Sequence, residues 1–262
     1  MTVRVEAMWG TTIRVEVRDA LDPTELDVVF DWFGEVDARF STWRDDSEIS
    51  RLAAGTLRLA DASDDVRTVL ARCEDAKQRS GGAFDIAYAV HPRVAPAPGR
   101  RLIDPSGFVK GWGVDRAAEL LVARGIDAFA INAGGDIVTR GRPRADGGWR
   151  IGIQHPDERG CVAAVIELED GAVATSARYE RGDHILDPRT GEHAVGLMSV
   201  TVVGADLADA DAAATAAMVL GDDGPSWLAS LPDVEALCIT NDRRVVTTDG
   251  FDRHRCHTPS LP

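Results

Sequence analysis

The sequence is poor in features that would tie a protein to a membrane or to nucleic acid. It contains no run of about 18 apolar residues that could span a bilayer. Its first residues form neither a signal peptide, with a basic segment before an apolar run, nor a lipobox. Positive charge is also scarce, because 43 Asp and Glu oppose 29 Lys and Arg and give a formal net charge of -14. We therefore expect a cytoplasmic protein without membrane insertion and without a nucleic-acid partner.

Cysteine is scarce as well. The four cysteines, at positions 73, 161, 238 and 256, are far apart and form no Cys-x-x-Cys pair. This spacing argues against a zinc knuckle and against a redox motif, so we expect reduced, structural thiols. The run from His254 to His257 contains two histidines and a cysteine, but it lies in a short tail that ends in proline. A disordered tail explains this run better than a metal site.

The composition is that of a globular protein, with 44% hydrophobic and 27% charged residues in a chain of 262. A chain of this length fits one elaborated domain. It contains no repeat, and no linker is long enough to separate two domains. We expect one domain over residues 1–251, followed by a C-terminal tail over residues 252–262.

Two hydrophobic periodicities alternate along the chain, which predicts a mixture of strands and helices. Asp22 before Pro23 is typical of a helix start, and Ser63 before two acids is another. An alanine-rich run from Asp209 predicts a helix that ends at Gly221. The expected strands are residues 3–7, 12–17, 128–131, 137–138, 149–153, 161–168 and 199–203, with a terminal hairpin over 236–240 and 243–248.

The stretch from Asp104 to Asp136 organises the rest of the sequence. We expect two glycine-bearing turns that flank one helix over residues 115–123, with Gly125 as its C-cap. The first of these turns carries Lys110 between two aspartates. Backbone amides near a cation favour binding of phosphate oxygens.

Asp211 and Thr215 are spaced four residues apart, so both side chains lie on one face of the predicted helix. Both offer oxygen atoms, which Mg²⁺ prefers as ligands. In the alternative, Asp211 lies in the first helical turn, where the helix dipole favours an acid, and Thr215 bonds back to a carbonyl. Spacing alone favours that alternative.

Three other segments have two interpretations each. Trp9, in a predicted turn, is either packed or in contact with a ligand, and the pattern does not decide between them. Residues 40–52 are an exposed loop or a loop that carries Trp43 as a stacking platform. Residues 172–191, which include Thr175 and His184, are rich in polar groups. Composition favours a solvated loop between strands for them.

Taken in order, these segments resemble the ApbE-type FAD:protein FMN transferases, from about residue 8 to residue 251. The resemblance implies an α+β (mixed α/β) fold in a single elaborated domain, with mostly antiparallel sheets and packed helices. It also implies an enzyme that moves FMN from FAD onto a Thr or Ser hydroxyl of an acceptor flavoprotein and releases AMP. The matching segments are residues 10–11, 40–52, 82–85, 106–115, 132–136, 174–176 with 179–181, 184–191 and 211–215.

Mg²⁺ assists the members of this family, and the resemblance implies which residues would serve here. Asp211 and Thr215 would be side-chain ligands of Mg²⁺, and Gly107 would offer its backbone carbonyl. His184 matches the base for the acceptor hydroxyl, and Lys110 adds positive charge. The residues that would contact the flavin nucleotide are Trp9 (where the family usually has Met), Trp43, Ala83, Phe84, Asp85, Asp104, Lys110, Thr175 and Ile185.

The sequence departs from the family pattern in two places. Ile86 and the three residues after it replace a Pro-Thr and Gly-Pro pattern, and Ala177 with Arg178 replaces a common Gly-Asp. An arginine in place of an acid changes the charge beside the expected metal and phosphates. Two other functions compete with FMN transfer, namely hydrolysis of FAD to FMN and AMP by a pyrophosphatase and FAD binding without turnover.

Overall fold

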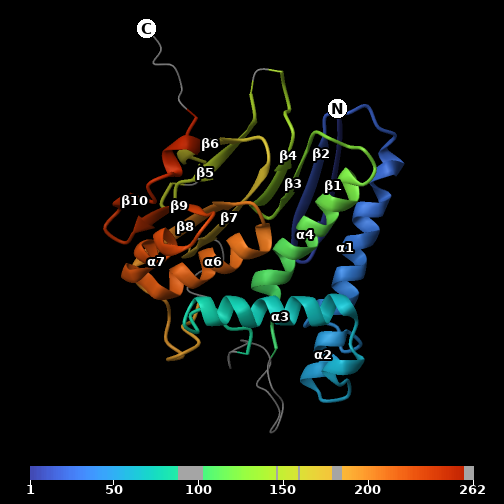
Figure 1. The fold of residues 1–262 in the computed structure, drawn as a ribbon, viewed down its shortest axis with the longest axis horizontal. Helices are drawn as coiled ribbons and strands as arrows, with labels where there is room; N and C mark the ends of the chain where they lie inside the picture. Colours follow the sequence, from blue (N-terminus) through green and yellow to red (C-terminus); the bar gives the residue numbers. More distant parts are fainter. Residues whose placement is uncertain (88–102, 146, 159, 179–184, 257–262) are drawn as a thin grey trace.

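A computed structural model describes residues 1–87, 103–145, 147–158, 160–178 and 185–256 (Figure 1). Its framework is a sheet with the strand order β1-β2-β3-β4-β7-β8-β9-β10, and each of these pairings is antiparallel. A second sheet pairs β5 with β6, again antiparallel. The expected strands are confirmed, and β7 is an additional strand. The bounds are β1 Thr2–Met8, β2 Thr11–Val17, β3 Phe129–Ala133, β4 Asp136–Arg140, β5 Trp149–Gln154, β6 Val162–Leu168, β7 Gly171–Ala177, β8 Leu197–Gly204, β9 Glu235–Thr240 and β10 Val245–Thr247.

The helices begin where side chains can satisfy their free amides. Asp22 forms a capping box with Glu25 around a single turn that leads into the first long helix. Ser63 and Asp206 each cap a later helix with one hydrogen bond, from the Val66 amide to the Ser63 hydroxyl and from the Asp209 amide to the Asp206 carboxylate. The helices are α1 Asp27–Phe40, α2 Glu48–Ala53, α3 Asp64–Arg79, α4 Ser106–Val122, α6 Leu207–Leu220 and α7 Gly224–Ser230.

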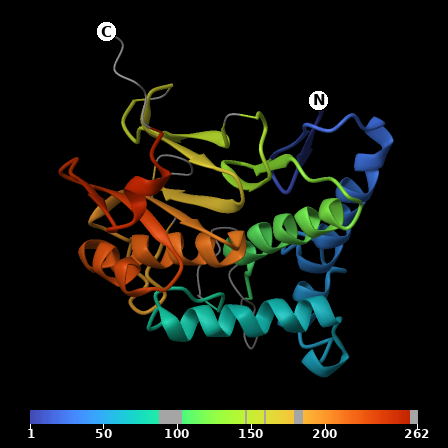
Figure 2. The ribbon, with the colours of Figure 1, turned by 45° about the horizontal axis from the view of Figure 1, so that its top comes forward.

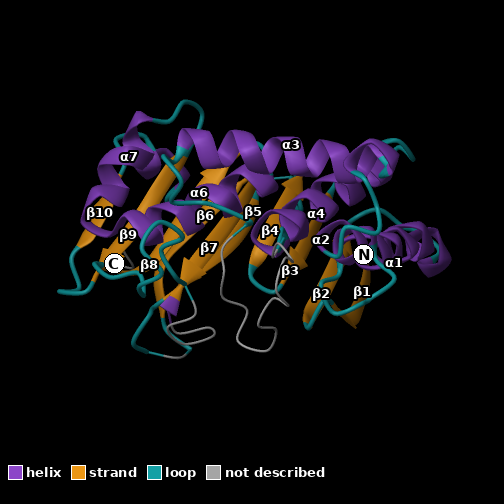
Figure 3. Ribbon diagram, turned by 90° about the horizontal axis from the view of Figure 1, so that it is seen from below, coloured by secondary structure: helices purple, strands orange, loops and turns teal. Residues whose placement is uncertain are grey.

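The main core lies between the large sheet and three helices. The helices gather on one side of the strands (Figure 3). Strand β2 shows the pattern, because Ile13, Val15 and Val17 are fully buried under the helices while the residues between them are not. The helical side of this core is formed by apolar residues of α1, α4 and α6. Polar residues of the helix layer can therefore contact residues of the central strands β4 and β7.

Two smaller cores complete the layers. α3 packs against the outer side of the helix layer (Figure 2), where a second cluster includes Val66, Val69, Phe108 and Trp112. On the opposite face of the large sheet, β5 and β6 cover β7, β8 and β9 through a third cluster. The alternation of side chains along each strand therefore decides whether a polar residue faces the helices or the β5–β6 sheet.

Helix α4 corrects the prediction for the central stretch. The predicted first turn is helical, because α4 begins at Ser106 and not at Asp115. Its glycines permit close packing: a Cβ at Gly111 would lie 2.7 Å from Ala208 Cα, and one at Gly113 would lie 2.9 Å from the Trp9 ring. The glycines are therefore contact points within a helix. At its other end, the apolar side chain of Val122 is 50% exposed.

Two polar segments also differ from the predicted loops. Within residues 40–52, Ser47 caps the short helix α2, and Ile49 is fully buried. Within residues 172–191, the first six residues belong to β7, a strand buried between β4 and β8. Small residues fill β7 because α6 packs directly over it. A strand of such small and polar residues cannot be recognised from composition alone.

The end of the described chain rests against β6. Phe251 is fully buried, and the amide of Cys256 donates a hydrogen bond of 2.8 Å to the carbonyl of Val165. Residues 257–262 of the expected tail, including His257, lie outside the described residues. Among the helices that the structure describes, none has the length and apolar character needed to cross a membrane.

Candidate functional site

The candidate site lies where α4 and α6 pack side by side over the sheet (Figure 2). Gly111 of α4 faces the backbone at Ala208 of α6, and no side chain separates the helices there. Lys110 precedes this contact on α4, and Asp211 follows it by three residues on α6. The close approach therefore brings a cation and an acid from distant parts of the sequence to one place.

A cluster of three charged residues forms at this contact. The Lys110 ammonium pairs with Asp136, and it lies 3.6 Å from Oδ2 of Asp211. Both carboxylates are buried, with Asp136 1% and Asp211 5% exposed. Charges in such positions are expensive unless they are paired, so the ammonium is essential to both acids. We call Lys110, Asp136 and Asp211 the charged cluster.

Strand β4 supplies Asp136 through a tight turn after β3. Gly134 and Gly135 have φ angles of 65° and 101°, which a glycine adopts without strain. A Cβ at Gly134 would also lie 2.4 Å from the Thr11 hydroxyl. The turn places Asp136 so that its Oδ1 accepts a 3.0 Å hydrogen bond from the Thr175 amide. β4, β7, α4 and α6 thus meet at the charged cluster.

Two hydroxyls on neighbouring residues of β7 face different layers. Ser176 Oγ lies 3.2 Å from Thr215 Oγ1 of α6, on the helix side of the sheet. Thr175 Oγ1 instead lies 2.9 Å from Thr201 Oγ1 of β8. The Thr175 side chain therefore turns away from α6, and its backbone amide is the part that contacts the charged cluster. Ser176, which the sequence analysis did not select, offers the hydroxyl beside α6.

The donor set fits a small divalent cation. Asp211 lies beyond the first turn of α6, since that helix begins at Leu207, so its position does not depend on the helix dipole. Thr215 places a hydroxyl one turn further along, and Gly107 lies one turn before Gly111 on α4. The described residues contain no group of three or more His, Cys, Asp or Glu side chains suited to a metal. Mg²⁺ tolerates this, because it commonly keeps waters and substrate phosphates among its ligands.

The predicted flavin segment lies next to the first turn of α4. Ala83 and Phe84 are buried, and a Cβ at Gly107 would be 3.6 Å from the Phe84 ring. Asp104 accepts a 3.0 Å hydrogen bond from the amide of Ser106, the first residue of α4. Ile185 is partly buried against both helix-side cores. Ala83, Phe84 and Asp104 are thereby grouped at the start of α4.

Both lysines of the chain belong to this region. Lys77 and Lys110 are the only lysines in the sequence, where arginine is the usual cation. Lys77 pairs with Asp85 of the predicted flavin segment at 2.8 Å, and Lys110 belongs to the charged cluster. Arginine and lysine are not interchangeable where a compact ammonium is required. This scarcity is a sequence signal for the site that our sequence analysis did not use.

The remaining predicted residues have different surroundings. The Trp9 indole donates a 3.1 Å hydrogen bond to the Phe33 carbonyl and packs edge-to-face on the Phe33 ring at 4.9 Å. Trp9 is therefore packed, and only the rest of its ring surface is left for a ligand. Trp43 is 68% exposed, in the segment before α2. His184 lies outside the described residues.

Asp115 is a further residue that the sequence analysis left without a role. Its carboxylate accepts hydrogen bonds from the first amides of α6. Burial raises the pKa of Asp115 to about 7, with a further rise from the nearby Asp206 carboxylate, although the amide donors oppose both effects. In the sequence, only the position of Asp115 in the stretch from Asp104 to Asp136, one helical turn after Gly111, indicated a role near the site.

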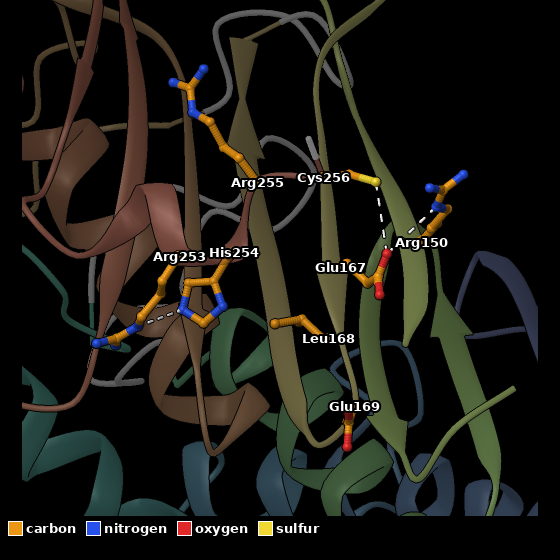
Figure 4. A pocket seen from close by; sticks show the side chains of 8 residues that line it. All are labelled: Arg150, Glu167, Leu168, Glu169, Arg253, His254, Arg255 and Cys256. Atoms are coloured by element: carbon orange, nitrogen blue, oxygen red, sulfur yellow. Dashed lines mark hydrogen bonds and ion pairs between the residues drawn. The ribbon is translucent and has the colours of Figure 1, made fainter. Parts of the chain in front are cut away.

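A separate pocket of about 300 Å³ lies on the other side of the molecule, beside β5, β6 and the C-terminal segment (Figure 4). Its arginines have acidic partners, since Arg150 lies 3.5 Å from Glu167 and Arg253 lies 3.2 Å from Glu235. Burial lowers the pKa of His254, and the adjacent Arg253 adds to the effect. This pocket shares no residue with the charged cluster, so it is not the candidate site.

Comparison with known proteins agrees with the resemblance seen in the sequence. The model of the ApbE family matches residues 9–96 and 93–238. The FAD:protein FMN transferase of Vibrio cholerae is 31% identical over 88% of this chain and 81% of that protein. The FAD:protein FMN transferase of Treponema pallidum is 28% identical over 96% and 88%.

Solved structures show the same fold. The flavin transferase ApbE from Vibrio cholerae superimposes with a TM-score of 0.81 at 26% identity, over 97% of this chain and 98% of that one. An ApbE protein from Thermotoga maritima gives a TM-score of 0.84 at 22% identity, over 98% and 99%, and supports the fold alone. The mixed fold with antiparallel sheets in one unit is therefore confirmed.

Proposed function

This chain belongs to the ApbE family, and from that premise we propose that it is a Mg²⁺-dependent FAD:protein FMN transferase. It transfers FMN from FAD to a Thr or Ser hydroxyl of an acceptor flavoprotein and releases AMP. The observation that carries this proposal is the charged cluster, in which Lys110 of α4 meets the buried Asp136 and Asp211, with Thr215 one turn further along α6. FAD binding without turnover does not need such a group of charges at a helix contact.

The residues that would hold the cation are Asp211 and Thr215, with the carbonyl of Gly107. When bound, Mg²⁺ supplies charge that stabilises pyrophosphate oxygens and the leaving phosphate of AMP. Lys110 orients the same oxygens with its ammonium, and Asp136 holds that ammonium in place. Cleavage of a pyrophosphate is mainly a problem of positioning and charge, which this arrangement addresses.

His184 is proposed as the base. In the transfer step, the acceptor hydroxyl oxygen forms a bond to the FMN phosphorus of FAD while the bond from that phosphorus to the AMP phosphate breaks. The hydroxyl proton passes to the imidazole of His184, and AMP leaves with the bridging oxygen. Neutral imidazole accepts a proton in the physiological pH range, which suits this role.

His184→Ala is expected to slow transfer to the acceptor by about 10²-fold or more, because that is a common contribution of a general base. FAD affinity should change much less, which fluorescence titration measures. His193→Ala is the matched control, since His193 is an exposed histidine in the same part of the chain. Equal losses of transfer and of FAD affinity in His184→Ala would assign His184 to binding instead.

The decisive experiment incubates the protein with FAD, Mg²⁺ and a candidate acceptor flavoprotein domain. Intact-mass analysis of the acceptor and chromatography of the nucleotides then follow the two products. We expect the mass of one FMN on the acceptor together with released AMP. FMN and AMP without a labelled protein would indicate hydrolysis, and unchanged FAD on the protein would indicate a carrier. A cytoplasmic location also stays a prediction, which cell fractionation tests.

A further inference from the structure

We propose that Asp115 is a positioning residue for the divalent-cation site, because it locks the start of α6 onto α4 and so holds Asp211 beside Lys110. This inference rests on the proposed function, in which Asp211 binds the cation. It assigns to Asp115 no contact with the cation or with FAD. Its role is to fix the relation between two helices that each supply part of the site.

Hydrogen bonds between Asp115 of α4 and the first amides of α6 connect the two helices, and we call this connection the joint. The Leu207 amide lies 3.0 Å from both carboxylate oxygens of Asp115, and the Ala208 amide donates to Oδ2 at 3.0 Å. These amides belong to the first turn of α6, which has no partners for them within the helix. A carboxylate at this end also complements the helix dipole. Asp115 therefore binds α6 at the point where a side chain on α4 can hold it best.

The contact at Gly111 leaves little freedom beside this joint. Gly111 lies so close to Ala208 that a Cβ would meet backbone atoms at 2.7 Å. The glycine sets how near the helices come, and Asp115 sets how α6 is placed along and around its axis. Asp211 is three residues beyond Ala208, about 4.5 Å along the helix at 1.5 Å per residue. A shift at the joint is therefore passed almost directly to the Asp211 carboxylate.

The electrostatic surroundings of Asp115 argue against an incidental cap. The Asp115 carboxylate is buried and lies near the acidic Asp206; its burial and the neighbouring negative charge each raise the pKa of Asp115. Arg72 of α3 lies 2.8 Å from Asp206 and 3.2 Å from Asp209, so it offsets the acids at this end of α6. Asparagine would place an NH₂ donor where one of the two oxygens that face the Leu207 amide now lies, so it could not hold α6 in the same way. A buried carboxylate that accepts from two amides of α6 fixes the position of that helix. Mg²⁺ ligands need such fixed positions because the ion requires near-ideal geometry.

The test measures cation binding directly, in the full chain and without turnover. Mn²⁺, used as a paramagnetic substitute for Mg²⁺, is titrated by electron paramagnetic resonance at a temperature where circular dichroism shows each variant folded. Asp115→Asn should weaken Mn²⁺ binding by about 10-fold or more. Losses of this size in metal affinity are typical when a residue that orients a metal ligand is mutated. FAD affinity, measured by fluorescence, should stay within about twofold of the wild type, as its predicted contacts lie elsewhere.

Asp206→Asn is the matched control. It removes a charge from the same end of α6 and from the pair with Arg72, but asparagine still accepts from the Asp209 amide, and the Leu207 and Ala208 amides keep their acceptors on Asp115. Mn²⁺ affinity should therefore be unchanged in this variant. If Asp206→Asn weakened Mn²⁺ binding as much as Asp115→Asn, the specific role of Asp115 would be refuted.

The outcomes separate this inference from the proposed function. Wild-type Mn²⁺ affinity in Asp115→Asn would overturn the role of Asp115 and leave the transferase proposal intact. Absence of Mn²⁺ binding in the wild type, both with and without FAD, would instead remove the cation from the proposed function, and the inference with it. If Asp115→Asn does not fold, Asp115→Glu decides, because it keeps the charge but lengthens the bridge. Weaker Mn²⁺ binding in folded Asp115→Glu supports the inference, and unchanged binding contradicts it.

Discussion

Asp211→Asn is expected to reduce Mg²⁺-dependent FMN transfer by about 10³-fold or more, because it removes the charged ligand of the cation while keeping the side-chain shape. A bound metal contributes several kcal/mol of charge stabilisation to such reactions, and each 1.36 kcal/mol corresponds to about a tenfold change in rate. The variant should remain folded, since Lys110 retains its pair with Asp136. The measurement is AMP release together with the FMN mass on the acceptor.

Asp209→Asn provides the control for Asp211→Asn. Asp209 is on the same helix and is also acidic, but it pairs with Arg72 and Arg79 away from the charged cluster. Transfer should stay within about twofold of the wild type, as for most surface changes. Full activity of Asp211→Asn across a range of Mg²⁺ concentrations would contradict the assignment of Asp211 as a ligand.

The elements that local chemistry controls could be predicted from the sequence. Alternation in residues 12–17 was enough for β2, because every second side chain is buried under the helices. An alanine-rich run gave α6, and its spacing placed Asp211 and Thr215 on one face. In each case the signal lies within a few residues, where periodicity is informative.

What depends on contacts between distant segments could not be predicted in this way. The glycines of α4 predict turns from the sequence, whereas in the structure Gly111 and Gly113 allow close packing against Ala208 and Trp9. The choice between Thr175 and Ser176 depends on which face of β7 meets α6, and that depends on the register with β8. The sequence shows Asp136 only as the last residue of the 132–136 segment, because its pairing with Lys110 depends on both the β3–β4 turn and the course of α4.

Lys110→Met is the second change with a large expected effect, because it acts on both activity and stability. Loss of a positive charge that meets the developing phosphate charge should slow transfer by about 10²-fold to 10³-fold. The same change leaves Asp136 and Asp211 buried without the ammonium. Removing one partner of a buried ion pair typically costs about 3–5 kcal/mol of unfolding free energy. Denaturant unfolding at neutral pH measures this loss.

Lys77→Met is the stability control. Its side chain is 39% exposed, and it pairs with Asp85 at 2.8 Å. Exposed ion pairs contribute at most about 1 kcal/mol, so the unfolding free energy should change little. Lys110→Arg tests the need for an ammonium: the charge remains, but the larger planar group does not fit a contact made for a lysine. We expect Lys110→Arg to be more stable than Lys110→Met and still impaired in transfer.

The double variant Lys110→Met, Asp136→Asn distinguishes the two roles of the lysine. Removal of one buried acid relieves the repulsion left by Lys110→Met, so the double variant should be more stable than the single one, a coupling that a double-mutant cycle measures. Transfer should not recover, because no cation has been returned to the phosphate. Added Mg²⁺ should raise the melting temperature of Lys110→Met more than that of the wild type, since a cation at Asp211 replaces part of the lost charge. An equal change in unfolding free energy for Asp136→Asn in the wild type and in Lys110→Met would show that Asp136 and Lys110 are not coupled, and would remove the charged cluster as the basis of the site.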